Sequence, residues 1–166
     1  FCSRPVFGDT FRSRSSRNIV DEMESVVSLG YDTLWFADDC FTITKDRVIG
    51  ICGEIIRRDL KVKWQCLSRV DTIDLEMAAK MKEAGCQRIY FGIEAGDNRI
   101  LRIMKKDIDL QVAQKAVSNA NSASIETGAF FIIGYPGDND QTILNTIKFA
   151  TSLPLDYVSF TLPYPI

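Results

Sequence analysis

A regular alternation of short apolar runs with amphipathic stretches is the feature that most restricts what this chain can fold into. The amphipathic stretches repeat apolar residues at the three-to-four-residue spacing of one buried helix face. The short runs between them are continuous in apolar character, as expected for strands buried on both sides. Helices are predicted near residues 18–29, 45–59, 75–84, 98–104, 110–123 and 140–152, and buried strands near residues 33–37, 62–67, 88–93, 128–133 and 157–162.

Strands that alternate with helices in this way form a parallel sheet covered by helices, an α/β fold. Two architectures have this pattern: an open doubly wound sheet and part of a (β/α) barrel. The pattern alone does not decide between them. In both, ligands bind at the carboxyl ends of the strands, so the residues that follow each strand are the candidates for a functional site.

Each expected strand is followed by polar residues or by a Gly/Pro turn that exposes the backbone. Asp38 and Asp39 follow the first recognisable strand, Arg69 follows the second, and Glu94 ends the third. The fourth runs into Ile133-Gly134-Tyr135-Pro136-Gly137, a sharp turn that lets a flat ligand approach the backbone closely. The opposite strand ends carry only glycine-closed helix turns, and this asymmetry predicts one functional face.

Each feature also has a purely structural interpretation. Asp38 or Asp39 can cap the following turn, and Glu94 can cap the following helix. A guanidinium such as that of Arg69 suits a ligand carboxylate or phosphate, but it can equally pair with Asp71. From the residues alone, both interpretations stay open.

The composition excludes several classes of function. The chain has no His, so most hydrolase and zinc-enzyme chemistries lack their usual base or ligand. Its five cysteines form no CxxC-type pair, which is typical of reduced thiols, and we expect a cytoplasmic protein. A net charge of −2 without a concentrated basic face argues against a nucleic-acid partner. No apolar run reaches the length of a membrane span.

Taken in order, these positions resemble the core of the radical S-adenosylmethionine (SAM) enzymes. The likeness is greatest to the branch with a cobalamin-binding domain before the core, the magnesium-protoporphyrin IX monomethyl ester oxidative cyclase-like Fe–S oxidoreductases. The resemblance implies a partial (β/α)6 TIM-like barrel, in which residues 1–166 supply strands two to six and the first strand is missing. The matching segments are FCSRPVFGDTFRSRS, LWFADDCFT, WQCLSRVDTID, MKEAGCQRIYFGIEAGDNRIL with MKK, FFIIGYPGD and LPYP.

The resemblance implies a [4Fe–4S] cluster held by three cysteines spaced C-x3-C-x2-C. Cys2 matches the last of the three, and the other two would lie upstream of this chain. Phe1 matches the aromatic residue beside the adenine of SAM. Cobalamin would be bound, if at all, by an upstream domain, and a flavodoxin- or ferredoxin-type protein would donate the electron.

The resemblance also implies SAM contacts after the strands. Asp38 and Asp39 match the acidic motif near the methionine amino group. Arg69 is the implied partner that binds the methionine carboxylate. Glu94 falls at the ribose contact, although EAGD stands where relatives more often have ESGS. The residues implied beside the adenine are Ile133, Gly134 and Tyr135.

The implied reaction is reductive cleavage of SAM to a 5′-deoxyadenosyl radical, which takes hydrogen from a small-molecule substrate that this chain does not identify. With one cluster cysteine of three, the 166-residue chain itself is expected to be inactive. Its open sheet should expose edges and apolar surface, which favour self-association.

Two other interpretations remain open. One is a divalent-metal-dependent (β/α)-barrel enzyme with Asp38, Asp39 and Glu94 as oxygen ligands. The other is a non-catalytic, barrel-derived binding domain.

Overall fold

The structure, a computed structural model, describes residues 11–163 and consists of a single five-stranded sheet with helices on one side. The strands are β1 (Thr33–Trp35), β2 (Lys63–Ser68), β3 (Cys86–Glu94), β4 (Glu126–Ile132) and β5 (Tyr157–Thr161). The helices are α1 (Ser16–Ser28), α2 (Lys45–Arg57), the short 3-10 helix η2 (Val70–Thr72), α3 (Leu75–Glu83), α4 (Asn98–Ile103), α5 (Leu110–Ser122) and α6 (Asp140–Ser152). Within this part of the chain, none of the helices has the length and apolar character needed to cross a membrane.

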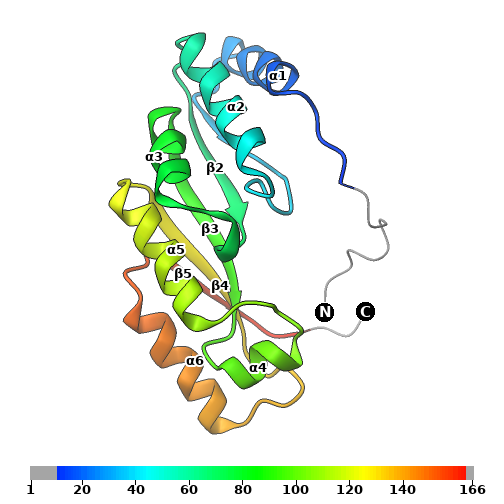
Figure 1. Ribbon diagram of the computed structural model, residues 1–166, viewed down its shortest axis with the longest axis vertical. Helices are drawn as coiled ribbons and strands as arrows, with labels where there is room; N and C mark the ends of the chain where they lie inside the picture. The colour runs from blue at the N-terminus through cyan, green and yellow to red at the C-terminus, as the bar shows by residue number, and fades with distance from the viewer. Residues whose placement is uncertain (1–10, 164–166) are drawn as a thin grey trace.

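The strands follow one another in chain order. The order is β1-β2-β3-β4-β5, and every neighbouring pair is parallel. Because each crossover leads to the next strand in the same direction, the helices stay on one side of the sheet (Figure 1). A doubly wound sheet would reverse its strand order at a switch point. The fold is therefore a half-barrel, which confirms the predicted partial TIM-like barrel and excludes the doubly wound alternative.

The hydrophobic core lies between the sheet and the helices. Trp64, Phe91 and Phe131 project from β2, β3 and β4 towards the helices and are fully buried, together with Ile51 of α2 and Met81 of α3. Burying a side chain of this size stabilises the fold by about 1.5–3 kcal/mol. The helices extend the layer by packing on one another, α1 on α2, α2 on α3 and α3 on α5.

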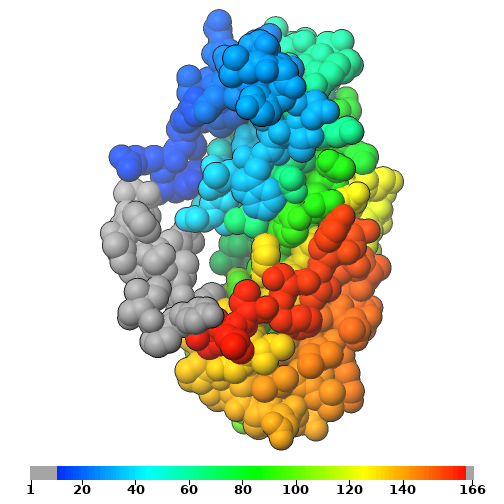
Figure 2. Space-filling view, turned by 180° about the vertical axis from the view of Figure 1, so that it is seen from behind, coloured from blue at the N-terminus to red at the C-terminus, as the bar shows by residue number. Residues whose placement is uncertain are grey.

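The central strand β3 separates two environments. Its odd-numbered residues from Ile89 to Ile93 are buried against the helices. Its even-numbered residues from Arg88 to Glu94 lie on the other side, here called the inner face, and are half-buried. Figure 2, seen from behind, shows that β5 lies at the molecular surface along its length. The inner face is thus the open side of the half-barrel.

All expected elements are present, with ends within two residues of the predicted ones. The burial predicted for the strand at residues 33–37 is wrong, because Trp35 is 47% exposed. β1 is an edge strand, and the Trp35 ring stays largely exposed although it contacts Tyr90. An apolar run therefore indicated a strand correctly but did not indicate how deeply it is buried.

The helix ends mostly follow the expected chemistry. Asp74 and Asp97 accept hydrogen bonds from backbone N–H groups at the starts of α3 and α4. Thr44 occupies the N-cap position of α2, but its side chain makes no capping hydrogen bond. Gly30 and Gly85 follow α1 and α3 in the left-handed region, with φ of 94° and 91°. The predicted glycine-closed helix ends are confirmed.

Candidate functional site

The candidate residues lie along one edge of the sheet. Because the strands are parallel, their carboxyl ends lie on the same side, with Asp38 and Asp39 after β1 and Arg69 after β2. Glu94 is the last residue of β3, and residues 133–135 follow β4. The edge predicted to be functional therefore exists, and the contacts of each residue show how it is used.

Glu94 has an unusual backbone conformation. Its φ is 73°, in the left-handed region that residues other than glycine seldom adopt, and the β3–β4 register shifts between Gly92 and Glu94. The Glu94 Oε1 atom lies 3.0 Å from Lys106 Nζ, and both side chains are only 13% exposed. A strained residue in a shielded ion pair at a strand end is a typical mark of a functional site.

The ion pair lies over Gly92 on the inner face. A Cβ atom at Gly92 would be 2.7 Å from Glu94 Oε1 and 3.4 Å from Lys106 Nζ. A side chain at this position would displace the pair, so glycine is required for its geometry. Lys106 was not among the residues predicted for the site, although the segment MKK that contains it was part of the resemblance.

Arg69 is engaged by its neighbour Asp71. Arg69 Nε and Nη2 donate to the two carboxylate oxygens of Asp71 at 2.8 and 2.6 Å. This bidentate bond lowers the pKa of Asp71, to which nearby Lys106 also contributes. Asp71 in turn raises the pKa of the Arg69 guanidinium. Arg69 thus pairs with Asp71, as its structural interpretation predicted. This pair lies close to Lys106.

The two adjacent acids after β1 differ in their surroundings. Asp38 Oδ2 accepts a 2.7 Å bond from Arg47 Nη2 of α2, and Arg47 also donates to the carbonyl of Phe41 at 2.9 Å. Asp39 is exposed and makes no ion pair with the residues in 11–163. Asp38 therefore fixes the loop to α2, while Asp39 is the acid accessible to a ligand.

The turn after β4 is held by Asp138. The backbone N–H groups of Gly134 and Tyr135 both donate to Asp138 Oδ2 at 3.0 Å, and Thr142 donates to Oδ1 at 2.7 Å. Gly134 has φ of 81°, so the turn needs glycine there. Ile133 donates its N–H to the carbonyl of Thr161 on β5. The turn is rigid, and any contact with a ligand must use atoms other than these N–H groups.

The segment Glu94-Ala95-Gly96-Asp97 packs directly against α6. Gly96 N donates to Thr146 Oγ1 at 3.0 Å, and a Cβ atom at Gly96 would lie 2.6 Å from Thr146 Cα and from Phe149 Cβ. Asp97 Oδ2 accepts a 2.9 Å bond from Asn145. Because α6 begins just after the Asp138 turn, the two loops that end β3 and β4 are fixed to the same helix.

The described residues do not fit an iron–sulfur cluster. Cys52, Cys66 and Cys86 are buried, and burial raises the pKa of Cys52 to about 12 and that of Cys66 well above its ordinary value. The raised pKa values keep Cys52 and Cys66 protonated, whereas a cluster ligand must be a thiolate. No three His, Cys, Asp or Glu side chains in residues 11–163 are grouped so that they could hold a metal, so a cluster would need ligands from outside this range. Phe1 and Cys2 both lie outside that range.

The alternative divalent-metal site is also unsupported. Among residues 11–163, no three His, Cys, Asp or Glu side chains are grouped so that they could hold a metal ion. Asp38 is paired with Arg47, and Glu94 with Lys106. The three acids proposed as oxygen ligands therefore do not converge.

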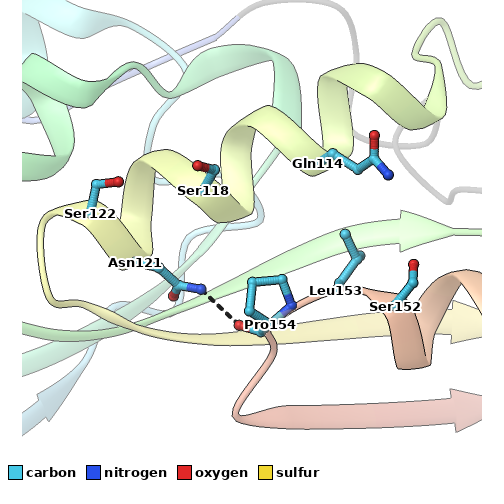
Figure 3. Close-up of a pocket in the computed structure, with 7 residues that line it drawn as sticks. All are labelled: Gln114, Ser118, Asn121, Ser122, Ser152, Leu153 and Pro154. Carbon is cyan, nitrogen blue, oxygen red and sulfur yellow. Dashed lines mark hydrogen bonds between the residues drawn. The ribbon is translucent and has the colours of Figure 1, made fainter.

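A groove of about 540 Å³ lies away from the candidate site (Figure 3). It separates the C-terminal part of α5 from the segment that links α6 to β5. Its wall includes Ser118 and Asn121, and Asn121 Nδ2 donates to the Pro154 carbonyl at 2.7 Å. This groove is at the opposite edge of the sheet from Glu94, because α5 ends where β4 begins.

The family to which the chain belongs follows from comparison with known proteins. The radical SAM superfamily matches residues 1–150, so the chain belongs to this superfamily. An uncharacterized methyltransferase from Pyrococcus horikoshii is 37% identical over 169 residues, covering 99% of this chain and 37% of that protein. The anaerobic magnesium-protoporphyrin IX monomethyl ester cyclase of Rubrivivax gelatinosus is 30% identical over 171 residues, covering 99% of this chain and 31% of that protein.

The fold also matches a solved structure. The radical SAM methyltransferase TsrM from Kitasatospora setae, with cobalamin and a [4Fe–4S] cluster bound, superposes with a TM-score of 0.85. The match covers 93% of this chain and 30% of that one at 19% identity. The predicted superfamily is confirmed by the family match, and this structure shows that the fold is shared. The chain spans about a third of the length of these relatives.

Proposed function

We propose that residues 1–166 form the SAM-binding part of a radical SAM enzyme, supplying strands two to six of its partial barrel. The proposal is carried by the Glu94–Lys106 pair, which combines strain, shielding and a position at the carboxyl edge of a half-barrel of this family. A [4Fe–4S] cluster held by Cys2 and two upstream cysteines would supply the electron for reductive cleavage of SAM to methionine and a 5′-deoxyadenosyl radical, which would take a hydrogen atom from the substrate.

The chain's own residues would orient SAM. Glu94 would accept hydrogen bonds from the ribose hydroxyls, because its carboxylate is held on the inner face by Lys106. Asp39, the exposed acid, would accept from the methionine amino group, while Asp38 keeps the loop in place through Arg47. The adenine would lie beside Ile133, Gly134 and Tyr135, whose turn is fixed by Asp138. Phe1 would pack on the adenine from the other side.

Two cations compete for the methionine carboxylate. The guanidinium of Arg69 already makes a bidentate pair with Asp71, so it would have to give up two hydrogen bonds to bind a ligand. Lys106 lies near both Glu94 and Asp71 and carries a compact ammonium with three donors, which can serve more than one acceptor. We therefore favour Lys106 and keep Arg69 as the second candidate. Equilibrium binding of SAM by the Lys106→Met and Arg69→Met variants separates the two candidates. Loss of the residue that binds the carboxylate should reduce SAM affinity about tenfold or more.

Cys2 would be the third cluster ligand. The spacing C-x3-C-x2-C would put the other two cysteines two and six residues before Phe1, so the coding sequence upstream is the first check. A polypeptide that includes those residues should bind iron and sulfide anaerobically. Cys2→Ala should abolish the cluster absorbance, and Cys40→Ala, a thiol on the sheet edge, should leave it unchanged.

Formation of 5′-deoxyadenosine from SAM in the presence of dithionite tests the function itself. The longer polypeptide should form it, Glu94→Gln should weaken SAM binding, and the 166-residue chain should form none. Robust cleavage by the 166-residue chain, or cleavage by the longer polypeptide that survives Cys2→Ala, would refute the proposal. Cluster binding without any SAM binding would instead favour a non-catalytic domain.

The partners follow from this chemistry. A flavodoxin- or ferredoxin-type protein would reduce the cluster, and an upstream domain would carry cobalamin if it is used. The 166-residue chain should self-associate, because Val158 and Phe160 on its edge strand β5 are more than two-fifths exposed. Size-exclusion chromatography at several concentrations checks this, and a single monomer peak throughout would contradict it.

A further inference from the structure

Four aromatic side chains on the inner face are joined by ring contacts that all meet at Tyr90. The Trp35 ring of β1 lies 5.4 Å from that of Tyr90 on β3, measured between centroids. Tyr90 lies 5.6 Å from Phe130 of β4, with the rings within 20° of parallel, and 6.4 Å from Tyr157 of β5. We call these four residues the aromatic shelf. Trp35 and Tyr157 are 47% and 44% exposed. The Arg88 guanidinium lies 3.9 Å from the Tyr157 ring centroid and donates to the hydroxyls of Tyr90 and Tyr157, so the open part of the shelf is formed by Trp35, Tyr90 and Phe130.

A glycine determines how the central ring of the shelf lies. Gly128 of β4 is paired with Tyr90 in the sheet, and a Cβ atom there would be 2.4 Å from Tyr90 Cδ1 and 2.7 Å from Cε1. The Tyr90 ring therefore lies down across β4 in space that any other residue would occupy. The result is a low aromatic surface on the sheet, continued by the nearly parallel Phe130 ring.

The shelf adjoins the proposed SAM site. On β3 the inner-face residue between Tyr90 and Glu94 is Gly92, which is paired with Phe130. The Glu94–Lys106 pair occupies the space above Gly92. No bulky side chain of β3 therefore separates the shelf from the residue proposed to hold the ribose.

We propose that the aromatic shelf binds the substrate, and that the substrate carries a flat, conjugated ring. Flat π-systems gain from offset stacking on aromatic rings, beyond the apolar area they bury, and aliphatic rings of the same size do not. A substrate seated there would lie next to the SAM ribose, where hydrogen abstraction must occur. This inference rests on the proposed function for the location of SAM, while the choice of a flat ring rests on the shelf itself.

Ring selectivity is the measurable signature. Calorimetric titration of the 166-residue chain with phenylacetate should give up to about tenfold tighter binding than titration with cyclohexaneacetate, which has the same charge and a non-planar ring of the same size. Tyr90→Leu should reduce phenylacetate affinity by a similar factor and bring the two probes close together. Trp35→Leu, at an exposed position that does not endanger folding, should cause a smaller loss in the same direction.

Phe160→Leu is the matched control. Phe160 is also aromatic and 44% exposed, but it is on the opposite side of β5, where its ring lies 5.6 Å from Phe131. Equal affinity for the two probes, or an equal effect of Phe160→Leu and Tyr90→Leu, would overturn the proposal. Loss of ring selectivity in a longer polypeptide would also overturn it, by showing that another segment covers the shelf.

SAM binding by the cluster-loaded longer polypeptide separates this inference from the proposed function. Tyr90→Leu should leave SAM affinity unchanged while it removes ring selectivity. Ring selectivity without SAM binding would remove the proposed function and keep the shelf as a binding site. SAM binding without ring selectivity would do the reverse.

Discussion

The two sides of β3 belong to one strand but are built on different rules. Towards the helices, Ile89, Phe91 and Ile93 are fully buried among other apolar side chains. On the inner face, Tyr90 and Glu94 are half-buried, and each makes a specific contact with a group from elsewhere in the chain. The helix side stabilises the fold by removing apolar surface from water, and many combinations of apolar residues can do this. The inner face depends on individual geometry and contributes less to stability.

The largest expected effect tests this contrast within β3. Phe91→Ala should lower the free energy of unfolding by about 3–5 kcal/mol, because it leaves a cavity in the core. Tyr90→Ala, one residue earlier, should cost clearly less, because its ring is already in contact with water. Urea unfolding followed by circular dichroism gives both values. Equal losses would mean that the two faces are energetically alike.

A second comparison uses two glycines. Gly96→Ala should destabilise the fold by about 2–3 kcal/mol, because the new Cβ would meet the backbone of α6 at 2.6 Å. Gly53→Ala should instead stabilise it by about 0.5–1 kcal/mol, since Gly53 is inside α2 with nothing within 4 Å of the new atom. Opposite shifts of the thermal midpoint are expected. Shifts of the same sign would show that the contact of Gly96 with α6 is not needed.

The inner-face ion pair is expected to have a smaller effect. Lys106→Met should cost about 1–2 kcal/mol, because it removes the cation that faces a shielded Glu94 carboxylate. The double variant Glu94→Gln with Lys106→Met should recover part of that loss. A double-mutant cycle in urea measures the coupling. If the free-energy losses of the two single variants add up to that of the double variant, the ion pair contributes no coupling energy to stability.

The smallest effect concerns acid sensitivity on the helix side. Arg57 and Arg58 donate hydrogen bonds to Glu54 and lower its pKa from an ordinary 4.5 to about 2. A carboxyl whose folded pKa is depressed stabilises the protein above the unfolded pKa and loses that effect as pH falls through the folded one. The stability advantage of the native chain over Glu54→Gln should therefore be full above about pH 4.5 and fade towards pH 2. Urea midpoints that run parallel over this range would contradict the assignment.

The order and type of the elements were predictable because they depend on local patterns. Apolar periodicity located every helix and strand, with ends within two residues of the predicted ones. The strand-end rule correctly placed Asp38, Arg69 and Glu94 along one edge of the sheet.

Partners and exposure were not predictable, because they depend on distant residues. The sequence does not indicate that Arg47 binds Asp38 or that Lys106 folds back over Gly92. Trp35 was expected to be buried because its run is apolar, and only the sheet order makes β1 an edge. The Arg69–Asp71 pair was predicted as an alternative, because residues two positions apart in the sequence are always close enough in space to interact.

The uninterrupted strand order has a consequence for biosynthesis. Each strand pairs with the one made immediately before it, so a βα unit can dock as soon as it leaves the ribosome. A sheet that winds outwards in two directions must instead return later strands to a place beside the first. In this half-barrel the growing edge during translation is always the newest strand, and the next strand covers it within one βα unit of synthesis.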